Sequence, residues 1–168
     1  MITKEWLTEQ RACNSGYRWF IEQTETDEFK LVETFIKMNR TDWAVWLIVH
    51  LLTHMEQIGF SGLCRNMAEK LYEEKYKKEN LLYSSKPELG APVMNEDPRH
   101  REKLAEQVMM QAYVKERILL GPADDVPCMA VAAAKYLSRA AMLVGREREV
   151  MLELIHEGLI TLKSKEKQ

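Results

Sequence analysis

The sequence lacks the features that identify several common classes of protein. Its three cysteines, Cys13, Cys64 and Cys128, are odd in number and widely spaced. A disulfide framework needs pairs, and a zinc site usually shows closely spaced ligands, so we interpret them as free thiols in a reducing compartment. The net charge of −2 is neither the basic excess typical of nucleic-acid-binding domains nor the strong acidic excess of a DNA mimic. Bulk charge therefore argues against nucleic acid as the partner.

A long apolar segment is also missing. The longest apolar stretch, Trp43–Leu52, is interrupted by His50 and falls far short of the roughly 20 residues that span a bilayer. The start of the chain, Met1–Trp6, has no apolar core of the kind found in a signal peptide. We therefore expect a cytoplasmic protein with no membrane partner.

Catalytic and phosphate-binding motifs are absent from the sequence as well. It contains neither a Walker-type phosphate loop nor the glycine fingerprint of dinucleotide-binding folds. Gly59-Phe60-Ser61-Gly62 resembles a nucleophile elbow only superficially, because no strand is predicted before it. We assign no catalytic residues and no cofactor, and the leading hypothesis below is not enzymatic.

The sequence does contain helical periodicity along most of its length. Apolar residues recur at intervals of three and four, and the alternation typical of strands is absent. The 168 residues predict one domain. We expect an all-α fold, an irregular bundle of about seven or eight helices with a long central loop. A tryptophan-rich half would cover residues 1–82, the loop residues 83–97, and an alanine-rich half residues 98–162.

Several helix boundaries can be predicted. A helix that is apolar on most sides, Trp43 through His54, is the candidate for the central buried helix. Gly59–Gly62 is expected to break the chain before the next helix at residues 63–79. Farther along, Gly145 should end an alanine-rich helix, and Gly158 should cap the last helix.

His50 and His54 are the candidate metal ligands. They lie four residues apart on a predicted helix, so both side chains could face one ion. Leu51 follows His50, so the glutamate of the zinc-protease motif is missing. Glu56 or a distant acidic residue or cysteine could supply a further ligand. The alternative is that both are ordinary histidines that form hydrogen bonds at the edge of the core.

Aromatic residues and the central loop suggest a binding surface. All four tryptophans lie within the first 46 residues. They could build an N-terminal core or an interaction surface, since tryptophan and tyrosine are enriched at binding hot spots. A loop as long as residues 83–97 is commonly functional or mobile in a compact domain. We expect partner-binding residues in and beside this loop: Tyr83, Met94, Arg99 and Arg101.

The first third of the chain resembles a leader segment found in uncharacterised phage and prophage proteins. The matching residues are Ile2-Thr3-Lys4-Glu5-Trp6-Leu7, Ala12-Cys13, Gly16, Trp19-Phe20 and Asp42-Trp43-Ala44-Val45-Trp46-Leu47-Ile48. The resemblance implies a phage accessory protein that acts in the cytoplasm of a bacterial host, and it assigns no active residues. The alanine-rich half is similar to helical immunity-type proteins of bacterial conflict systems, a likeness that assigns no residues either.

The leading hypothesis is a non-enzymatic, phage-encoded protein that docks a helical surface onto a host or phage protein. Its specific form would be an inhibitor of a host defence system, similar in role to anti-CRISPR proteins. One alternative is a metal-dependent enzyme or metal-binding protein built around His50 and His54. Another is a nucleic-acid-binding protein that uses Arg99, Arg101 and Lys103. A homodimer through the alanine-rich helices is also compatible with the sequence, which does not separate an intramolecular helix contact from an intermolecular one.

Overall fold

The computed structural model describes residues 1–84, 102–108, 110 and 126–165, and every element of secondary structure in these residues is an α-helix. The labelled helices are α1 (Lys4–Glu9), α2 (Asn14–Ile21), α3 (Glu28–Lys37), α4 (Thr41–Leu51), α5 (His54–Ser84), α7 (Val126–Leu143) and α8 (Glu147–Lys165). Residues 102–108 are helical too. The predicted all-α fold is therefore confirmed.

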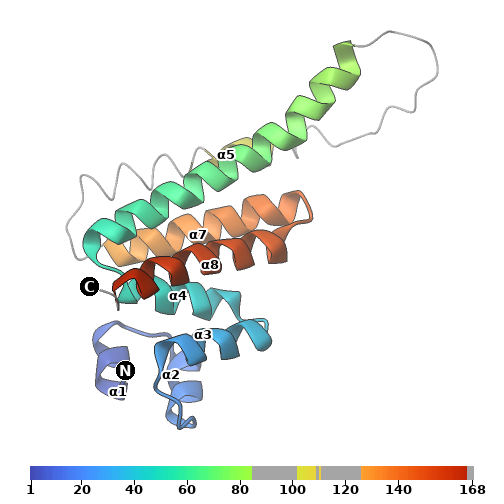
Figure 1. Ribbon diagram of the computed structural model, residues 1–168. Helices are drawn as coiled ribbons and strands as arrows, with labels where there is room; N and C mark the ends of the chain where they lie inside the picture. The colour runs from blue at the N-terminus through green and yellow to red at the C-terminus, as the bar shows by residue number, and fades with distance from the viewer. Residues whose placement is uncertain (85–101, 109, 111–125, 166–168) are drawn as a thin grey trace.

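Helix α4 lies between two groups of helices. Figure 1 shows α1, α2 and α3 on one side of α4, and α5, α7 and α8 on the other. Helix α4 contacts α3, α7 and α8. Five of its residues are buried: Ala44, Val45, Leu47, Ile48 and Val49. The prediction of a central buried helix in this segment is confirmed, and its apolar surface on most sides follows from having neighbours in both groups.

The boundary between α4 and α5 differs from the prediction. Helix α4 ends at Leu51, and His54 begins α5. The reason is a capping box: the backbone N–H of Thr53 donates to Glu56 Oε2 at 2.7 Å, and that of Glu56 donates to Thr53 Oγ1 at 3.4 Å. The buried Gln57 amide donates to the carbonyls of Val49 and Leu52, which satisfies acceptors at the end of α4.

Helix α5 passes through both glycines that were expected to break it. It is continuous over 31 residues from His54 to Ser84, so the predicted break at Gly59–Gly62 is wrong. Each glycine costs a helix about 1 kcal/mol relative to alanine. The burial of Phe60, Cys64 and other apolar side chains on the same helix offsets that cost. The predicted loop also starts too early, because Tyr83 and Ser84 belong to α5, while residues 85–97 lie outside the described part of the chain.

Gly158 does not cap the last helix, contrary to the prediction. Helix α8 continues to Lys165, and Gly158 is buried within it. A Cβ atom at Gly158 would lie 2.6 Å from Ile48 Cγ2 and 3.3 Å from the ring of Phe60. The missing side chain therefore lets α8 approach α4 and α5 closely. Gly145, in contrast, ends α7 as predicted, with a φ of +71° that glycine adopts without strain.

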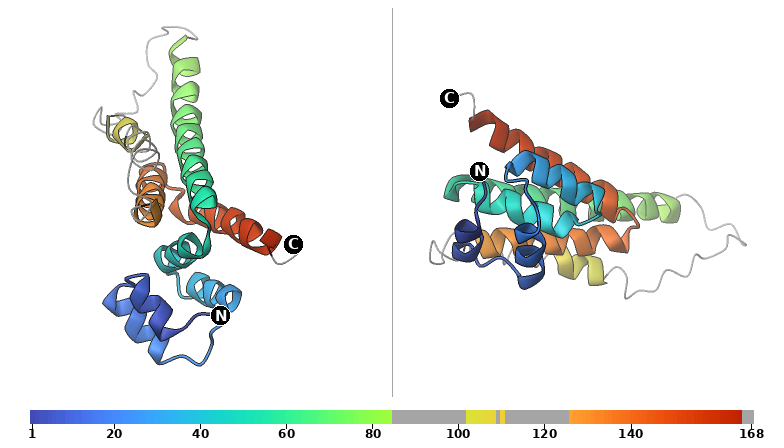
Figure 2. Two further views of the ribbon diagram at one scale, coloured as in Figure 1. Left: turned by 90° about the vertical axis from the view of Figure 1, so that its left-hand side faces the viewer. Right: turned by 90° about the horizontal axis from the view of Figure 1, so that it is seen from below.

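The alanine-rich helix α7 uses its small residues within the chain. Five of its alanines are buried: Ala130, Ala133, Ala134, Ala140 and Ala141. Helix α7 packs against α5, α4 and α8, and the three views agree that it lies alongside α5 (Figures 1 and 2). The alanine face is thus an intramolecular contact, and a homodimer would have to form through another surface.

Candidate functional site

The four tryptophans form an aromatic layer between the first helices and α4. Trp6 meets Trp46 edge to face with ring centroids 6.0 Å apart, and Trp19 lies 6.0 Å from Trp43. Phe35 lies 5.0 Å from Trp19 and 5.6 Å from Trp43. All four tryptophans are half-buried and pack against the core. This packing supports the interpretation of the tryptophans as part of an N-terminal core.

An apolar cavity of about 50 Å³ lies within this layer. Its lining includes Phe20, Phe35, Trp43 and Trp46, and Cys13 lies in its wall. The Cys13 side chain caps α2, because its Sγ accepts a hydrogen bond from the Gly16 N–H at 3.4 Å.

The surroundings of Cys13 favour its thiolate. Partial burial opposes ionisation, but the hydrogen bonds from Ser15 and Gly16 and the positive charge of Arg40 outweigh it, so the pKa of Cys13 is lowered. Cys64 has the opposite environment: it is fully buried, and the desolvation of its charged form strongly raises its pKa. Cys13 is therefore a better nucleophile at neutral pH than Cys64.

The two candidate metal ligands do not share a helix. His50 lies in the last turn of α4, and His54 is the exposed first residue of α5. His50 stacks on Trp46 with centroids 4.1 Å apart, and its Nδ1 lies 2.7 Å from the Trp46 carbonyl oxygen. The premise that one helix presents both histidines is wrong, because Thr53 starts a new helix between them. Within the described ranges, no group of three or more His, Cys, Asp or Glu side chains could hold a metal ion.

A second candidate site is a cleft of about 470 Å³ between α5 and α8. The two helices are antiparallel, and one ion pair joins them beyond each end of the cleft. At one end Arg146 Nη1 lies 2.8 Å from Glu74 Oε2. At the other end Lys165 Nζ lies 2.6 Å from Glu56 Oε2. The cleft occupies the length between these two pairs.

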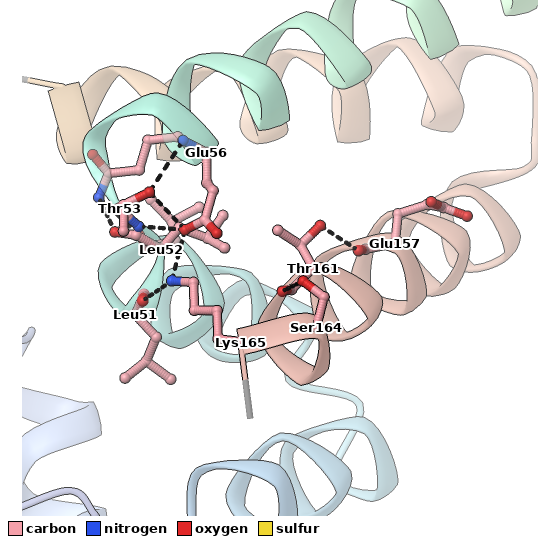
Figure 3. A network of polar contacts seen from close by, with 10 residues as sticks. Leu51, Leu52, Thr53, Glu56, Glu157, Thr161, Ser164 and Lys165 are labelled. Atoms are coloured by element: carbon pink, nitrogen blue, oxygen red, sulfur yellow. Dashed lines mark hydrogen bonds and ion pairs between the residues drawn. The ribbon is translucent and has the colours of Figure 1, made fainter. Parts of the chain in front are cut away.

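The Lys165 ion pair fixes one end of the cleft by joining three helices. Besides Glu56, the Lys165 ammonium group donates to the carbonyl of Leu51 at 3.2 Å, which is the last residue of α4 (Figure 3). Burial opposes ionisation of Glu56, but the hydrogen bonds from Lys165 and Thr53 outweigh it and lower the pKa of Glu56. The C-terminal turn of α8 is therefore held against the α4–α5 junction.

The lining of the cleft combines acidic and apolar side chains. Its lining residues are Leu63, Asn66, Met67, Glu69, Lys70 and Glu73 from α5, with Glu153 and Glu157 from α8. The lining thus holds four glutamates, two on each helix, and one lysine, which lies on α5. On α5, Glu69 Oε1 also accepts a bond of 2.6 Å from Arg65 Nε. The geometry suits a positively charged guest with an apolar face.

Sequence reasoning missed this cleft and favoured other residues. Tyr83 lies in the last turn of α5, and its side chain is outside the described part of the structure, as are Met94, Arg99 and Arg101 entirely. The signal that could have found one wall is the spacing of Glu153 and Glu157, which places two carboxylates on one face of a helix. The other wall is at least 80 residues away in the chain, so no local pattern pairs the two.

No helix in the described ranges combines the length and the apolar character needed to cross a membrane. Comparison of the chain with protein-family models, with curated proteins and with solved structures finds no match.

Proposed function

We propose that this chain is a non-enzymatic protein-binding protein whose docking site is the α5–α8 cleft. The observation that carries the proposal is the lining of the cleft, in which two long helices bring four glutamates together with the apolar residues Leu63 and Met67. A polar rim around an apolar centre is the usual anatomy of a protein-binding surface. The ion pairs at both ends keep the walls in place before a partner arrives, which lowers the ordering cost of binding.

The test is affinity capture with a matched pair of charge-reversal variants. The immobilised full chain is exposed to a bacterial extract, and bound proteins are identified by mass spectrometry. The cleft variant carries Glu153→Lys and Glu157→Lys. The control variant carries Glu9→Lys and Glu33→Lys, the same charge change at exposed positions of α1 and α3. A partner that the wild type and the control retain and the cleft variant loses supports the proposal.

Equal capture of the same proteins by all three forms would show that the cleft is not the docking site. Circular dichroism and thermal unfolding of each variant check that the fold is retained. The same proteins are then mixed in pure form, because a direct complex of defined stoichiometry separates docking from indirect capture.

The narrower proposal is a phage-encoded inhibitor of a host defence system that acts in the bacterial cytoplasm. It is supported by the resemblance of the N-terminal third to phage and prophage proteins. The test expresses the chain in bacteria with an active defence system and measures the plating efficiency of a sensitive phage. Rescue of plating by the wild type, and its loss in the Glu153→Lys, Glu157→Lys variant, is expected. No rescue in any tested defence system would count against this role while leaving protein binding intact.

A further inference from the structure

We infer that the α5–α8 cleft takes a basic amphipathic helix of a protein partner. The inference rests on the proposed docking site and goes beyond it by stating the chemistry of the guest. Three features of the cleft carry it: the sign of its charge, the position of its apolar side chains and its length.

Charge selects a basic guest. Glu69 and Glu73 on one wall face Glu153 and Glu157 on the other, and Lys70 is the single basic residue of the lining. Arg65 pairs with Glu69 on α5, but Glu153 and Glu157 keep the α8 wall acidic, so an acidic segment or a nucleic-acid backbone would meet like charge there. Lysine or arginine side chains from a guest would complement both walls at once, and their complementarity speeds the encounter.

Apolar side chains select an amphipathic guest. Leu63 and Met67 are one helical turn apart on α5 and are the apolar residues of the lining. On α8, Ile160 follows Glu157 by three residues and lies along the same side of the helix. The Ile160 residue is 50% exposed, so a guest that covers it removes apolar surface from water. A wholly charged guest would leave this surface uncovered.

The length of the cleft suits a short helix. From Leu63 to Glu73, α5 rises about 15 Å, which is close to three turns. A guest helix of about ten residues lies along this length while its own backbone hydrogen bonds stay satisfied. A guest that binds by adding a strand would need an unpaired sheet edge, and both walls of the cleft are helices.

The inference is tested with three fluorescent synthetic peptides of 14 residues and the full chain. The first peptide places lysines and leucines on opposite faces of a helix. The second has the same composition in an order without an apolar face, and the third replaces every lysine of the first with glutamate. Binding is measured by fluorescence anisotropy at low and physiological salt. We expect the first peptide to bind at least tenfold more tightly than the second, the third not to bind, and added salt to weaken binding.

Variants of the chain test whether the first peptide binds in the α5–α8 cleft. The Glu153→Lys, Glu157→Lys variant should bind the first peptide about tenfold more weakly, because four units of charge change beside the guest. The Glu9→Lys, Glu33→Lys control should bind it like the wild type. The variant Ile160→Ser should weaken binding of the first peptide and leave the salt dependence of binding unchanged. This result would separate the contribution of the apolar contact from that of charge.

Each contrary outcome overturns a stated part. Equal binding of the first two peptides would refute the amphipathic requirement, and equal binding by the cleft and control variants would refute the location. If the cleft variant loses a captured protein partner but no basic peptide binds the wild type, protein docking stands and the basic-helix inference fails. Light scattering that shows a dimer disrupted by the first peptide would make a second copy of this chain the occupant and refute a foreign helix.

Discussion

Gly158 is the residue at which the closeness of α8 to α4 can be measured. The perturbation is Gly158→Ala, which adds one methyl group. In an ordinary helix interior this change stabilises, because alanine exceeds glycine in helix propensity by about 1 kcal/mol. At Gly158 the added Cβ would lie 2.6 Å from Ile48 Cγ2, and Ile48 is fully buried. Non-bonded carbon atoms prefer separations of about 3.5–4.0 Å, so α8 or the Ile48 side chain must shift by roughly 1 Å.

The magnitude follows from two opposing effects. Overpacking a close-fitting core costs about 1–3 kcal/mol, and the propensity gain returns about 1 kcal/mol. We expect Gly158→Ala to lower the free energy of unfolding by up to about 2 kcal/mol, which is up to about 8 °C in Tm for a chain of this size. Gly59 lies in α5, and a Cβ atom added there would meet nothing within 4 Å. Gly59→Ala should therefore raise the free energy of unfolding by about 0.5–1 kcal/mol.

The assay is urea unfolding monitored by circular dichroism. It compares the wild type, Gly158→Ala, Gly59→Ala, Ile48→Ala and the double variant Ile48→Ala, Gly158→Ala. Ile48→Ala removes the atom that the new methyl group would strike. In that background Gly158→Ala should be neutral or stabilising, since the methyl group fills part of the space left by Ile48. If Gly158→Ala stabilises the wild type as much as Gly59→Ala does, the close approach of α8 to α4 is refuted.

Three further outcomes are expected. Burial lowers the pKa of His50 from its ordinary value of 6.5, and the hydrogen bond with the Trp46 carbonyl opposes this shift. His50 therefore favours the folded state above pH 6.5, and this stability is lost as the pH falls below that value. The variant His50→Gln should flatten the pH dependence of urea unfolding between pH 7 and 5, and an unchanged slope would contradict the burial of His50. Lys165→Ala should lower the free energy of unfolding by about 1 kcal/mol at pH 7. A pH titration of stability should show the pKa of Glu56 returning toward its ordinary value. An unaltered titration would show that the Lys165–Glu56 ion pair contributes nothing to stability. Iodoacetamide at pH 7 should alkylate Cys13 readily and Cys64 only after unfolding, and peptide mass spectrometry that finds Cys64 modified first would refute the assigned environments.

Local sequence patterns predicted the elements that depend on neighbouring residues. The apolar character of residues 43–51 on most sides predicted the central helix, and Gly145 predicted the end of α7. These features rest on residues within one or two helical turns of each other, which is the range that a sequence pattern records.

The wrong predictions at three glycines share a physical cause, which is contact between distant segments. Gly59, Gly62 and Gly158 carry strong breaking or capping signals, but burial against other helices keeps α5 and α8 continuous through them. The pairing of His50 with His54 failed for a local reason that was present in the sequence. Thr53 and Glu56 form a capping box, whose spacing predicts a helix start between the two histidines.

The sequence by itself determined that this protein is helical, that α4 is buried, and that α7 ends at Gly145. Periodicity and capping depend on neighbouring residues, so they can be recognised in the amino-acid sequence alone. Only the tertiary structure decided which side chains share a site. It brought Leu63–Glu73 beside Glu153 and Glu157 across at least 80 residues of chain, placed Cys13 at an apolar cavity, and turned the tryptophans toward the core. The reason is that α8 packs on α4 and α5 through Gly158, which lies against Ile48 and Phe60, and through Lys165, which pairs with Glu56. No local pattern encodes these contacts.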